Sequence, residues 1–174
     1  MSLNDIQNSI RNVPDFPQKG IQFKDITTAI KQPQIFREII DTLAQKLANR
    51  KIDKVIGIEA RGFIFGAALA YKLGCGFVPV RKPNKLPAET MIQEYALEYG
   101  NDRLEIHTDA LTEGMQVLVV DDLLATGGTA WATAQLVERL GAEVAAFAFV
   151  VELTDLRGGE RLMPFGEVIS LVKY

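Results

Sequence analysis

Residues 34–50 carry an apolar side chain at every fourth position. The apolar members of this series are Ile35, Ile39, Leu43 and Leu47. Because an α-helix completes a turn in about 3.6 residues, side chains at this spacing share one face of a helix. The pattern therefore predicts an amphipathic helix over residues 34–50 with its apolar face on the core.

A strand–helix–strand unit follows this helix. Residues 54–58 form a short apolar run that is typical of a buried strand. Residues 63–73 are rich in small side chains and predict a helix that ends at Gly74. Residues 77–80 read as a second strand, in which Pro79 lacks the N–H group that a sheet ladder needs.

A second unit of the same kind lies further along the chain. Residues 116–120 predict a strand, residues 129–140 a helix that is capped by Gly141, and residues 144–151 another strand. The strands of both units are apolar on both faces, as in a parallel sheet that helices cover on both sides. We therefore expect an α/β fold with a central, mainly parallel sheet flanked by helices.

The two units are joined by a long polar connection over residues 81–112. Gly100, Asn101 and Asp102 form a turn signal, and the sequences on either side, EYALEY and RLEIH, alternate between polar and apolar residues. This alternation predicts an exposed hairpin. A connection of this length inside a compact domain is usually functional, so we interpret it as a lid.

Length, composition and charge limit the possible functions. The chain has 174 residues, and 48% of them are hydrophobic and 24% charged, as in a single globular domain. Its net charge of -3 provides no general attraction for nucleic acid or an anionic membrane. Cys75 is the only cysteine, which excludes an internal disulfide. The sequence has no secretory signal or membrane-spanning segment, so we expect a cytoplasmic protein.

The stretch VLVVDDLLATGGTA at residues 117–130 combines two carboxylates with a glycine-rich turn. Residues 125–129 could form a phosphate cradle before a helix, or an ordinary turn in which Thr126 or Thr129 caps the helix. Asp121 and Asp122 could be solvated acids or a Walker B-like magnesium site, but the chain has no G-x-x-x-x-G-K-[ST] partner. It also lacks the G-x-G-x-x-G of a dinucleotide site.

A ribose 5-phosphate accounts for both parts of this stretch. Carboxylates accept hydrogen bonds from sugar hydroxyl groups, whereas a nest of backbone N–H groups binds phosphate. We therefore expect Asp121 and Asp122 to hold the 2′ and 3′ hydroxyl groups. The residues expected to hold the 5′-phosphate are Ala125, Thr126, Gly127, Gly128 and Thr129.

The same stretch resembles the phosphoribosyl-pyrophosphate (PRPP) signature of type I phosphoribosyltransferases. The further motifs are PDFPQKGIQFKDIT at 14–27, GIEARGFIFG at 57–66, VRKPNKLP at 80–87, LEYG at 97–100 and VVELTDLRG at 150–158. Together they resemble the adenine phosphoribosyltransferase family over nearly the whole chain. The resemblance implies one domain over residues 1–174, with an N-terminal hood at 1–33 and a catalytic lid at 82–109. It also implies synthesis of AMP and pyrophosphate from adenine and PRPP, with Mg2+, by a cytoplasmic homodimer.

The resemblance further implies a pyrophosphate site built from two loops. The first contains Ala60, Arg61 and Gly62, with a cis peptide bond between Glu59 and Ala60 and with Arg61 in contact with pyrophosphate across the dimer interface. The second supplies Arg81, Lys82 and Lys85. Positive charge at this place would stabilise the departing pyrophosphate, and Mg2+, held mainly by PRPP near Asp121 and Asp122, would share that role.

By the same resemblance, Glu98 is the catalytic carboxylate near the purine, with Arg61 as its catalytic partner, and Tyr99 closes over PRPP. Phe23 is expected to stack on adenine while the backbone of Gln22 and Lys24 reads its edge. Phe23 could instead pack in the core. Two alternatives remain open: an oxopurine phosphoribosyltransferase, and a non-catalytic regulator that binds PRPP.

Overall fold

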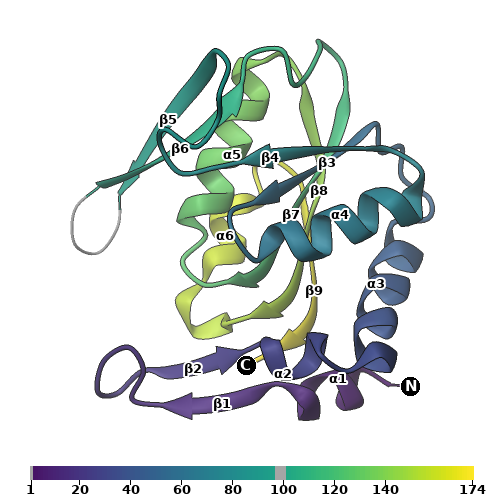
Figure 1. Cartoon of the computed structure of the whole chain (residues 1–174), viewed down its shortest axis with the longest axis vertical. Helices are drawn as coiled ribbons and strands as arrows, with labels where there is room; N and C mark the ends of the chain where they lie inside the picture. The colour runs from purple at the N-terminus through teal and green to yellow at the C-terminus, as the bar shows by residue number, and fades with distance from the viewer. Residues whose placement is uncertain (1, 97–100) are drawn as a thin grey trace.

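The computed structural model describes residues 2–96 and 101–174 of the chain. A five-stranded sheet lies at its centre, in the order β4-β3-β7-β8-β9, and every neighbouring pair of strands is parallel (Figure 1). The strands are β3 (Lys54–Ile58), β4 (Gly76–Val80), β7 (Gln116–Leu124), β8 (Glu143–Glu152) and β9 (Glu167–Lys173). The α/β class and the parallel sheet are confirmed.

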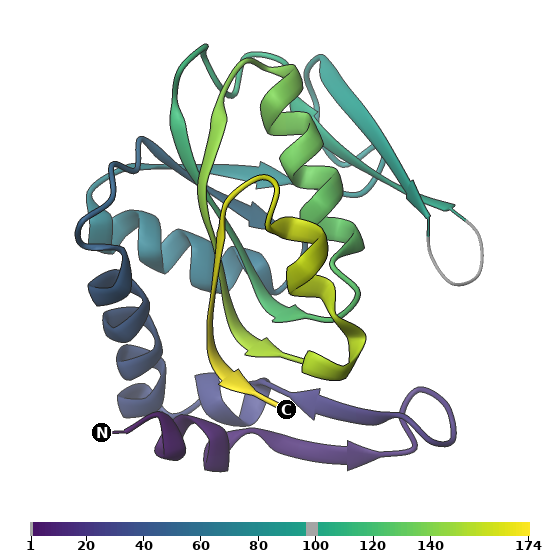
Figure 2. The same ribbon diagram turned by 180° about the vertical axis from the view of Figure 1, so that it is seen from behind.

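Helices cover both faces of this sheet. One face carries α3 (Pro33–Leu47) and α4 (Gly62–Leu73), and the other carries α5 (Gly128–Arg139) and α6 (Gly158–Leu162) (Figures 1 and 2). The strands alternate between two hydrophobic cores: Leu118 and Val120 pack on the side of α3 and α4, whereas Val117 and Val119 pack on the side of α5. This alternation explains why the strands are apolar on both faces.

The predicted helices and strands agree with the observed ones except at their ends. Helix α3 begins with Pro33 in its first turn, which suits a residue without an N–H group, and it ends at Leu47 rather than at residue 50. Helix α4 ends at Leu73 and is capped by Gly74, whose φ of +70° is the left-handed conformation typical of a helix C-terminus. Pro79 lies in β4, an edge strand of the sheet, where a missing donor is tolerated.

Strand β7 is longer than predicted. It continues past residue 120 to Leu124, so Asp121 and Asp122 lie within the strand and not in the turn after it. The prediction was wrong because β8 offers a pairing partner over the whole length, up to the pair Leu124↔Glu152. Hydrogen bonding to a long neighbour therefore outweighs the low strand preference of aspartate.

The N-terminal segment forms a small unit below the sheet. It contains α1 (Leu3–Ser9), the antiparallel strands β1 (Arg11–Pro14) and β2 (Gln22–Asp25), and α2 (Thr27–Ile30) (Figure 1). Strand β2 pairs only with β1 among the described residues, so its other backbone edge is free of a ladder. The C-terminus lies beside this unit, and Lys24 Nζ is 4.0 Å from the centre of the Tyr174 ring.

A second antiparallel hairpin starts at the other end of the molecule and projects to the same side as the N-terminal hairpin (Figure 1). It consists of β5 (Thr90–Ala96) and β6 (Asn101–His107), so the predicted hairpin is confirmed (Figure 1). Its predicted turn was wrong, because Asn101 and Asp102 belong to β6 and pair with Ala96 and Tyr95. A hydrogen bond of 3.0 Å from the Tyr95 hydroxyl to Asp102 favours this register.

The sequence patterns did not predict the C-terminal elements η1 (Thr154–Leu156), α6 and β9. No helix in the described part of the chain is long and apolar enough to cross a membrane.

Candidate active site

Polar residues from two loops and from the end of one strand meet at one edge of the sheet. Arg61 follows β3, Arg81 follows β4, and Asp121 and Asp122 lie near the end of β7. Because these strands are parallel neighbours, their carboxyl ends open at the same edge, where α/β proteins bind their ligands. The sheet therefore brings together residues that are up to 61 positions apart, as between Arg61 and Asp122.

The two carboxylates are almost inaccessible to solvent, with 9% of Asp121 and 5% of Asp122 exposed. The backbone N–H of Asp122 donates a hydrogen bond of 2.8 Å to Oδ1 of Asp121. Burial, reinforced by the neighbouring charge of Asp122, raises the pKa of Asp121 well above its ordinary value. A buried carboxylate pair of this kind is poised to accept hydrogen bonds from a ligand.

Gly62 allows the first loop to approach these carboxylates. A Cβ atom on Gly62 would lie 2.7 Å from the carbonyl oxygen of Val120 and 3.0 Å from Oδ1 of Asp121. Any larger residue would push β7 and α4 apart. The peptide bond between Glu59 and Ala60 is cis, as the resemblance implied.

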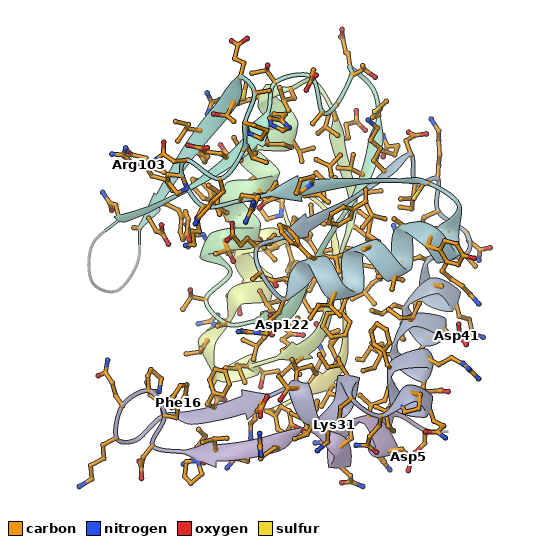
Figure 3. The ribbon with its side chains drawn as sticks, viewed as in Figure 1. Asp5, Phe16, Lys31, Asp41, Arg103 and Asp122 are labelled. Carbon is orange, nitrogen blue, oxygen red and sulfur yellow. The ribbon has the colours of Figure 1, made fainter. Side chains whose placement is uncertain are left out.

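Arg61 forms an ion pair with Asp122 of the same chain through Nε. Partial burial lowers the pKa of Arg61, but the pairing with Asp122 and the charges of Asp121 and Asp25 outweigh this effect, so its pKa is raised. Figure 3 labels Asp122 at the end of the sheet that faces the N-terminal hairpin. The Arg61 guanidinium lies 6.0 Å from the centre of the Phe23 ring, which connects this hairpin with the carboxylates.

Residues 125–129, which we call the glycine loop, run from the end of β7 into the first two residues of α5. Gly127 is the N-cap of α5 with a φ of +78°, a conformation that side chains other than glycine rarely adopt. The following N–H groups stand in the first turn of the helix, where they have no intrahelical partner. No side chain caps this helix, so the alternative in which Thr126 or Thr129 serves as N-cap was wrong.

The second basic loop is held by acidic residues. Glu59 accepts hydrogen bonds from Arg81 Nε at 3.1 Å and from the backbone N–H of Lys82 at 3.0 Å. Burial raises the pKa of Glu59, but the hydrogen bonds from Lys82 and Arg81 lower it by more than burial raises it. The pKa of Glu59 is therefore below its ordinary value. Arg81 also donates to the carbonyl oxygen of Lys85 at 3.2 Å, which closes the turn.

Lys82 connects this loop with the β5–β6 hairpin. Its ammonium group forms an ion pair with Asp102 and lies 3.2 Å from the hydroxyl oxygen of Tyr95. Burial lowers the pKa of Lys82, and the bonds to Asp102 and Tyr95 outweigh that effect, so its pKa is raised. Tyr95 also packs on the glycine loop, because a Cβ atom on Gly128 would lie 3.1 Å from its ring. Sequence analysis did not identify Tyr95 or Asp102 as site residues.

A pocket of 570 Å³ separates the N-terminal hairpin from the C-terminal segments. It is lined by Gly20, Ile21, Gln22, Lys24, Leu153, Asp155, Leu156 and Tyr174. Gln22 and Lys24 were predicted, whereas the four residues from the C-terminal part were missed. The motif VVELTDLRG carries three of them, but its apolar residues alone do not distinguish a ligand contact from core packing.

Phe23 does not line this pocket but lies on the opposite face of β2, since neighbouring residues of a strand alternate. Its ring contacts Phe16 edge-on at a centroid distance of 5.2 Å. The interpretation of Phe23 as a core residue was wrong, because it faces Phe16 and Arg61 rather than Ile26.

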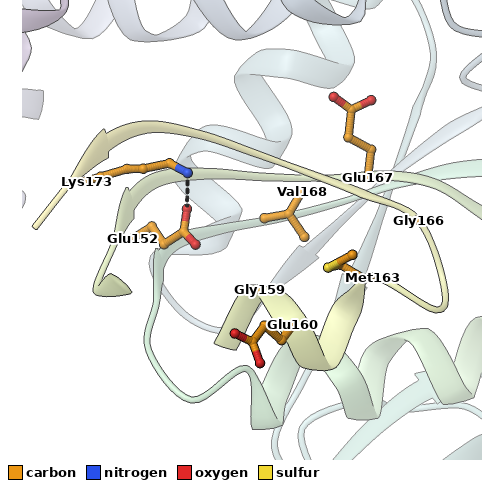
Figure 4. Close-up of a pocket in the computed structure, with 8 residues that line it drawn as sticks. All are labelled: Glu152, Gly159, Glu160, Met163, Gly166, Glu167, Val168 and Lys173. Atoms are coloured by element: carbon orange, nitrogen blue, oxygen red, sulfur yellow. Dashed lines mark ion pairs between the residues drawn. The ribbon is translucent and has the colours of Figure 1, made fainter. Parts of the chain in front are cut away.

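Another pocket, of 580 Å³, lies between α6 and β9 (Figure 4). Its walls include Glu152 and Lys173, which form an ion pair of 3.3 Å, and none of its residues belongs to the predicted site. Glu98 and Tyr99 lie outside the described residues. Within the described residues, no group of three His, Cys, Asp or Glu side chains could hold a metal ion.

Comparison with known proteins agrees with this arrangement. The model of the phosphoribosyl transferase domain matches residues 27–164. The chain belongs to the phosphoribosyl transferase domain family. It is 57% identical over 174 residues to adenine phosphoribosyltransferase of Thermoanaerobacter sp. (strain X514), and the match covers 100% of both chains.

Solved members of the family share the fold. The crystal structure of adenine phosphoribosyltransferase from Thermoanaerobacter pseudethanolicus superimposes with a TM-score of 0.96 at 56% identity and covers 99% of this chain and 100% of that one. The enzyme from Saccharomyces cerevisiae, solved with adenine and an imino-altritol bisphosphate, gives a TM-score of 0.91 at 40% identity and covers 97% of each chain. The type I phosphoribosyltransferase fold is confirmed.

Proposed function

We propose that this chain transfers the 5-phosphoribosyl group of PRPP to N9 of adenine, giving AMP and pyrophosphate. The proposal rests on one observation: three features that suit parts of one ligand lie together at one edge of the sheet. These are the carboxylate pair, the glycine loop and two loops with basic side chains. Of the common phosphorylated metabolites, a ribose that bears a 5′-phosphate and a pyrophosphate matches all three features. The reaction class is pentosyl transfer, in purine salvage.

The ribose 5-phosphate half of PRPP would lie along β7 and the glycine loop. Asp121 and Asp122 would accept hydrogen bonds from the 2′ and 3′ hydroxyl groups. The free N–H groups at the start of α5 and the positive end of its dipole would hold the 5′-phosphate. The burial of the carboxylates supports this role, because a buried acceptor gains most from a donor that the ligand supplies.

The pyrophosphate half would lie between the two basic loops, near Ala60, Gly62 and the side chains of Arg61, Arg81 and Lys82. Lys85, which is exposed, would approach it from solvent. These charges would stabilise the negative charge that accumulates on the leaving group. Asp121 and Asp122 offer oxygen atoms of the kind that Mg2+ prefers, and Mg2+ would bind mainly through PRPP oxygens and water. When bound, it would neutralise part of the pyrophosphate charge.

Adenine would bind at the free backbone edge of β2. Gln22 and Lys24 lie two residues apart on β2, so their backbone N–H and C=O groups share one edge of the strand and would match the donor and acceptor pattern of a 6-aminopurine. Phe23 would stack on the ring from one side, and Leu156, which is 45% exposed, would cover it from the side of the pocket. An oxopurine presents an acceptor where adenine presents a donor, and this difference argues for adenine.

Transfer itself requires that N9 attacks C1′ of the ribose while the bond to pyrophosphate breaks. Glu98 would accept the purine proton or favour the positive charge on the ribose, and Tyr99 would close over PRPP. Both roles come from the LEYG resemblance. Closure of the β5–β6 hairpin would exclude water, which competes with adenine for C1′.

A homodimer is part of the proposal, with Arg61 in contact with pyrophosphate across the dimer interface. Support comes from the outer side of α4, where Ile64 is 39% and Tyr71 is 91% exposed. Large apolar side chains at the surface are typical of protein contacts. The cytoplasmic location stays a prediction from the sequence.

The forward reaction tests the proposal. Purified protein with PRPP and Mg2+ should release pyrophosphate and form AMP when adenine is added. Failure to form AMP from adenine under these conditions, with the protein folded, would overturn it.

A further inference from the structure

Arg161 on α6 is a cation without an acidic partner in the described part of the chain. Its side chain is only partly exposed, yet among the described residues it forms no ion pair and donates no hydrogen bond. Arg157, at the start of the same helix, is by contrast 73% exposed and paired with Glu160 at 2.8 Å. A partly buried, unpaired guanidinium is available to an anion that comes from outside the chain.

A stacking contact determines where this guanidinium lies. Its central carbon is 4.8 Å from the centre of the Trp131 ring on α5, a favourable arrangement of a cation over an indole. Helix α6 lies beside the start of α5 (Figures 1 and 2). A Cβ atom on Gly127 would lie 2.8 Å from the carbonyl oxygen of Gly158, so α6 is packed directly against the glycine loop.

The stacked guanidinium reaches the first residue of α5. A Cβ atom built on Gly128 would lie 3.7 Å from Nη1 of Arg161. Gly128 begins the turn whose N–H groups we propose to hold the 5′-phosphate. An oxygen that accepts from such a group lies about 2.9 Å from its nitrogen, so the bound phosphate would lie next to Arg161.

The glycine loop supplies no positively charged side chain of its own. Residues 117–138 contain no lysine or arginine, whereas they contain Asp121 and Asp122 just before the loop. A phosphate monoester carries close to two negative charges at neutral pH, and the helix dipole offsets only about half of one charge. Lys82 lies near the loop through Tyr95, but its charge is paired with Asp102. Arg161 can therefore provide the charge that the loop lacks.

We infer that Arg161 binds the 5′-phosphate of PRPP and of AMP, as a further ligand-binding residue that α6 contributes. This inference rests on the proposed function. Trp131 holds the guanidinium in place before the ligand arrives, so little side-chain freedom is lost on binding. The contact favours a phosphorylated ribose over one without a phosphate.

A series of charges at position 161 tests this role by calorimetric titration with AMP, which carries the 5′-phosphate but no pyrophosphate. Arg161→Gln should bind AMP about tenfold or more weakly than the wild type, and Arg161→Glu more weakly still. Arg161→Lys keeps the charge and should stay within about threefold of the wild type. Arg157→Gln is the matched control, because Glu160 already neutralises that arginine, and it should bind AMP as the wild type does.

Steady-state kinetics provide a second readout. Arg161→Gln should raise the KM for PRPP about tenfold and leave kcat and the KM for adenine within about twofold of the wild type. Thermal unfolding checks that each variant is folded.

Two results would overturn the role of Arg161. One is an AMP affinity that is unchanged in both Arg161→Gln and Arg161→Glu. The other is a loss as large in Arg161→Lys as in Arg161→Gln, since this would show that the side chain acts by packing on Trp131 and not by its charge. A wild type that binds neither PRPP nor AMP would instead overturn the proposed function.

Discussion

Gly158 lies directly against Ala125 of the glycine loop. A Cβ atom built on Gly158 would lie 2.1 Å from the carbonyl oxygen of Ala125 and 2.9 Å from the backbone nitrogen of Gly127. These are backbone atoms and cannot give way as a flexible side chain can. The start of α6 therefore supports the loop that we propose to hold the 5′-phosphate, although α6 follows β8 and not β7.

The substitution Gly158→Ala tests this support. We expect it to displace the glycine loop, to raise the KM for PRPP at least about tenfold, and to lower the free energy of unfolding by about 1–3 kcal/mol, as overpacking does. Gly159→Ala is the control, because its Cβ would meet only the Glu152 carboxylate, at 3.1 Å. Equal kinetics for the two variants would exclude a supporting role for Gly158.

Asp121→Asn should stabilise the protein while weakening its function. The raised pKa of Asp121 means that the folded state binds a proton there more tightly than the unfolded state does. Ionisation of Asp121 at neutral pH therefore lowers the free energy of unfolding. This destabilisation decreases as the pH falls toward 3.8, the ordinary pKa of an aspartate side chain. Asparagine keeps the acceptor for the Asp122 N–H without the charge.

We expect the substitution to raise the free energy of unfolding at neutral pH by about 1 kcal/mol and to raise the KM for PRPP. Thermal unfolding as a function of pH measures the first effect. The advantage of the variant should shrink with acidification. Asp109→Asn, at an exposed position, should show neither change. A variant that is less stable than the wild type at neutral pH would contradict this account of Asp121.

Phe23→Ala should affect adenine rather than PRPP. Loss of a stacking ring is worth about 1–3 kcal/mol per base, so the KM for adenine should rise about tenfold or more. Phe16→Ala serves as control, because Phe16 is 51% exposed and touches Phe23 only edge-on. A rise in the KM for PRPP alone would remove Phe23 from the base site.

Glu98→Gln should lower kcat more than it raises either KM. Loss of general acid–base catalysis typically lowers a rate by about 100-fold or more. Glu94→Gln is the matched control, since Glu94 lies on β5 in an exposed ion pair of 2.8 Å with Arg103. If instead KM rises and kcat is unchanged, Glu98 is a binding residue.

The parallel sheet could be predicted from the sequence because its strands alternate with helices and are apolar on both faces. The carboxylates and the glycine loop were also recognisable, since they are contiguous along the chain. The contacts of Arg61 with Asp122, and of Gly158 with Ala125, could not be predicted in this way. They join residues that the fold brings together over long sequence separations, and neither leaves a periodic signal.

The pocket of 570 Å³ beside the N-terminal hairpin illustrates the same limit. Leu153 and Leu156, which follow β8, and Tyr174, which follows β9, lie near β2 because both strands end beside the N-terminal unit. In the sequence, these side chains look like any others of an apolar segment. The length of β7 was also missed, because it depends on β8 as a partner and not on its own residues.

The choice of base tests the central claim most directly. Adenine, guanine, hypoxanthine and xanthine should be offered separately with PRPP and Mg2+, and kcat/KM measured for each from the release of pyrophosphate. We expect adenine to exceed every oxopurine by about 100-fold or more, because the backbone edge of β2 would leave a buried group unpaired with the wrong base. An oxopurine that is used as well as adenine, or better, would contradict the account.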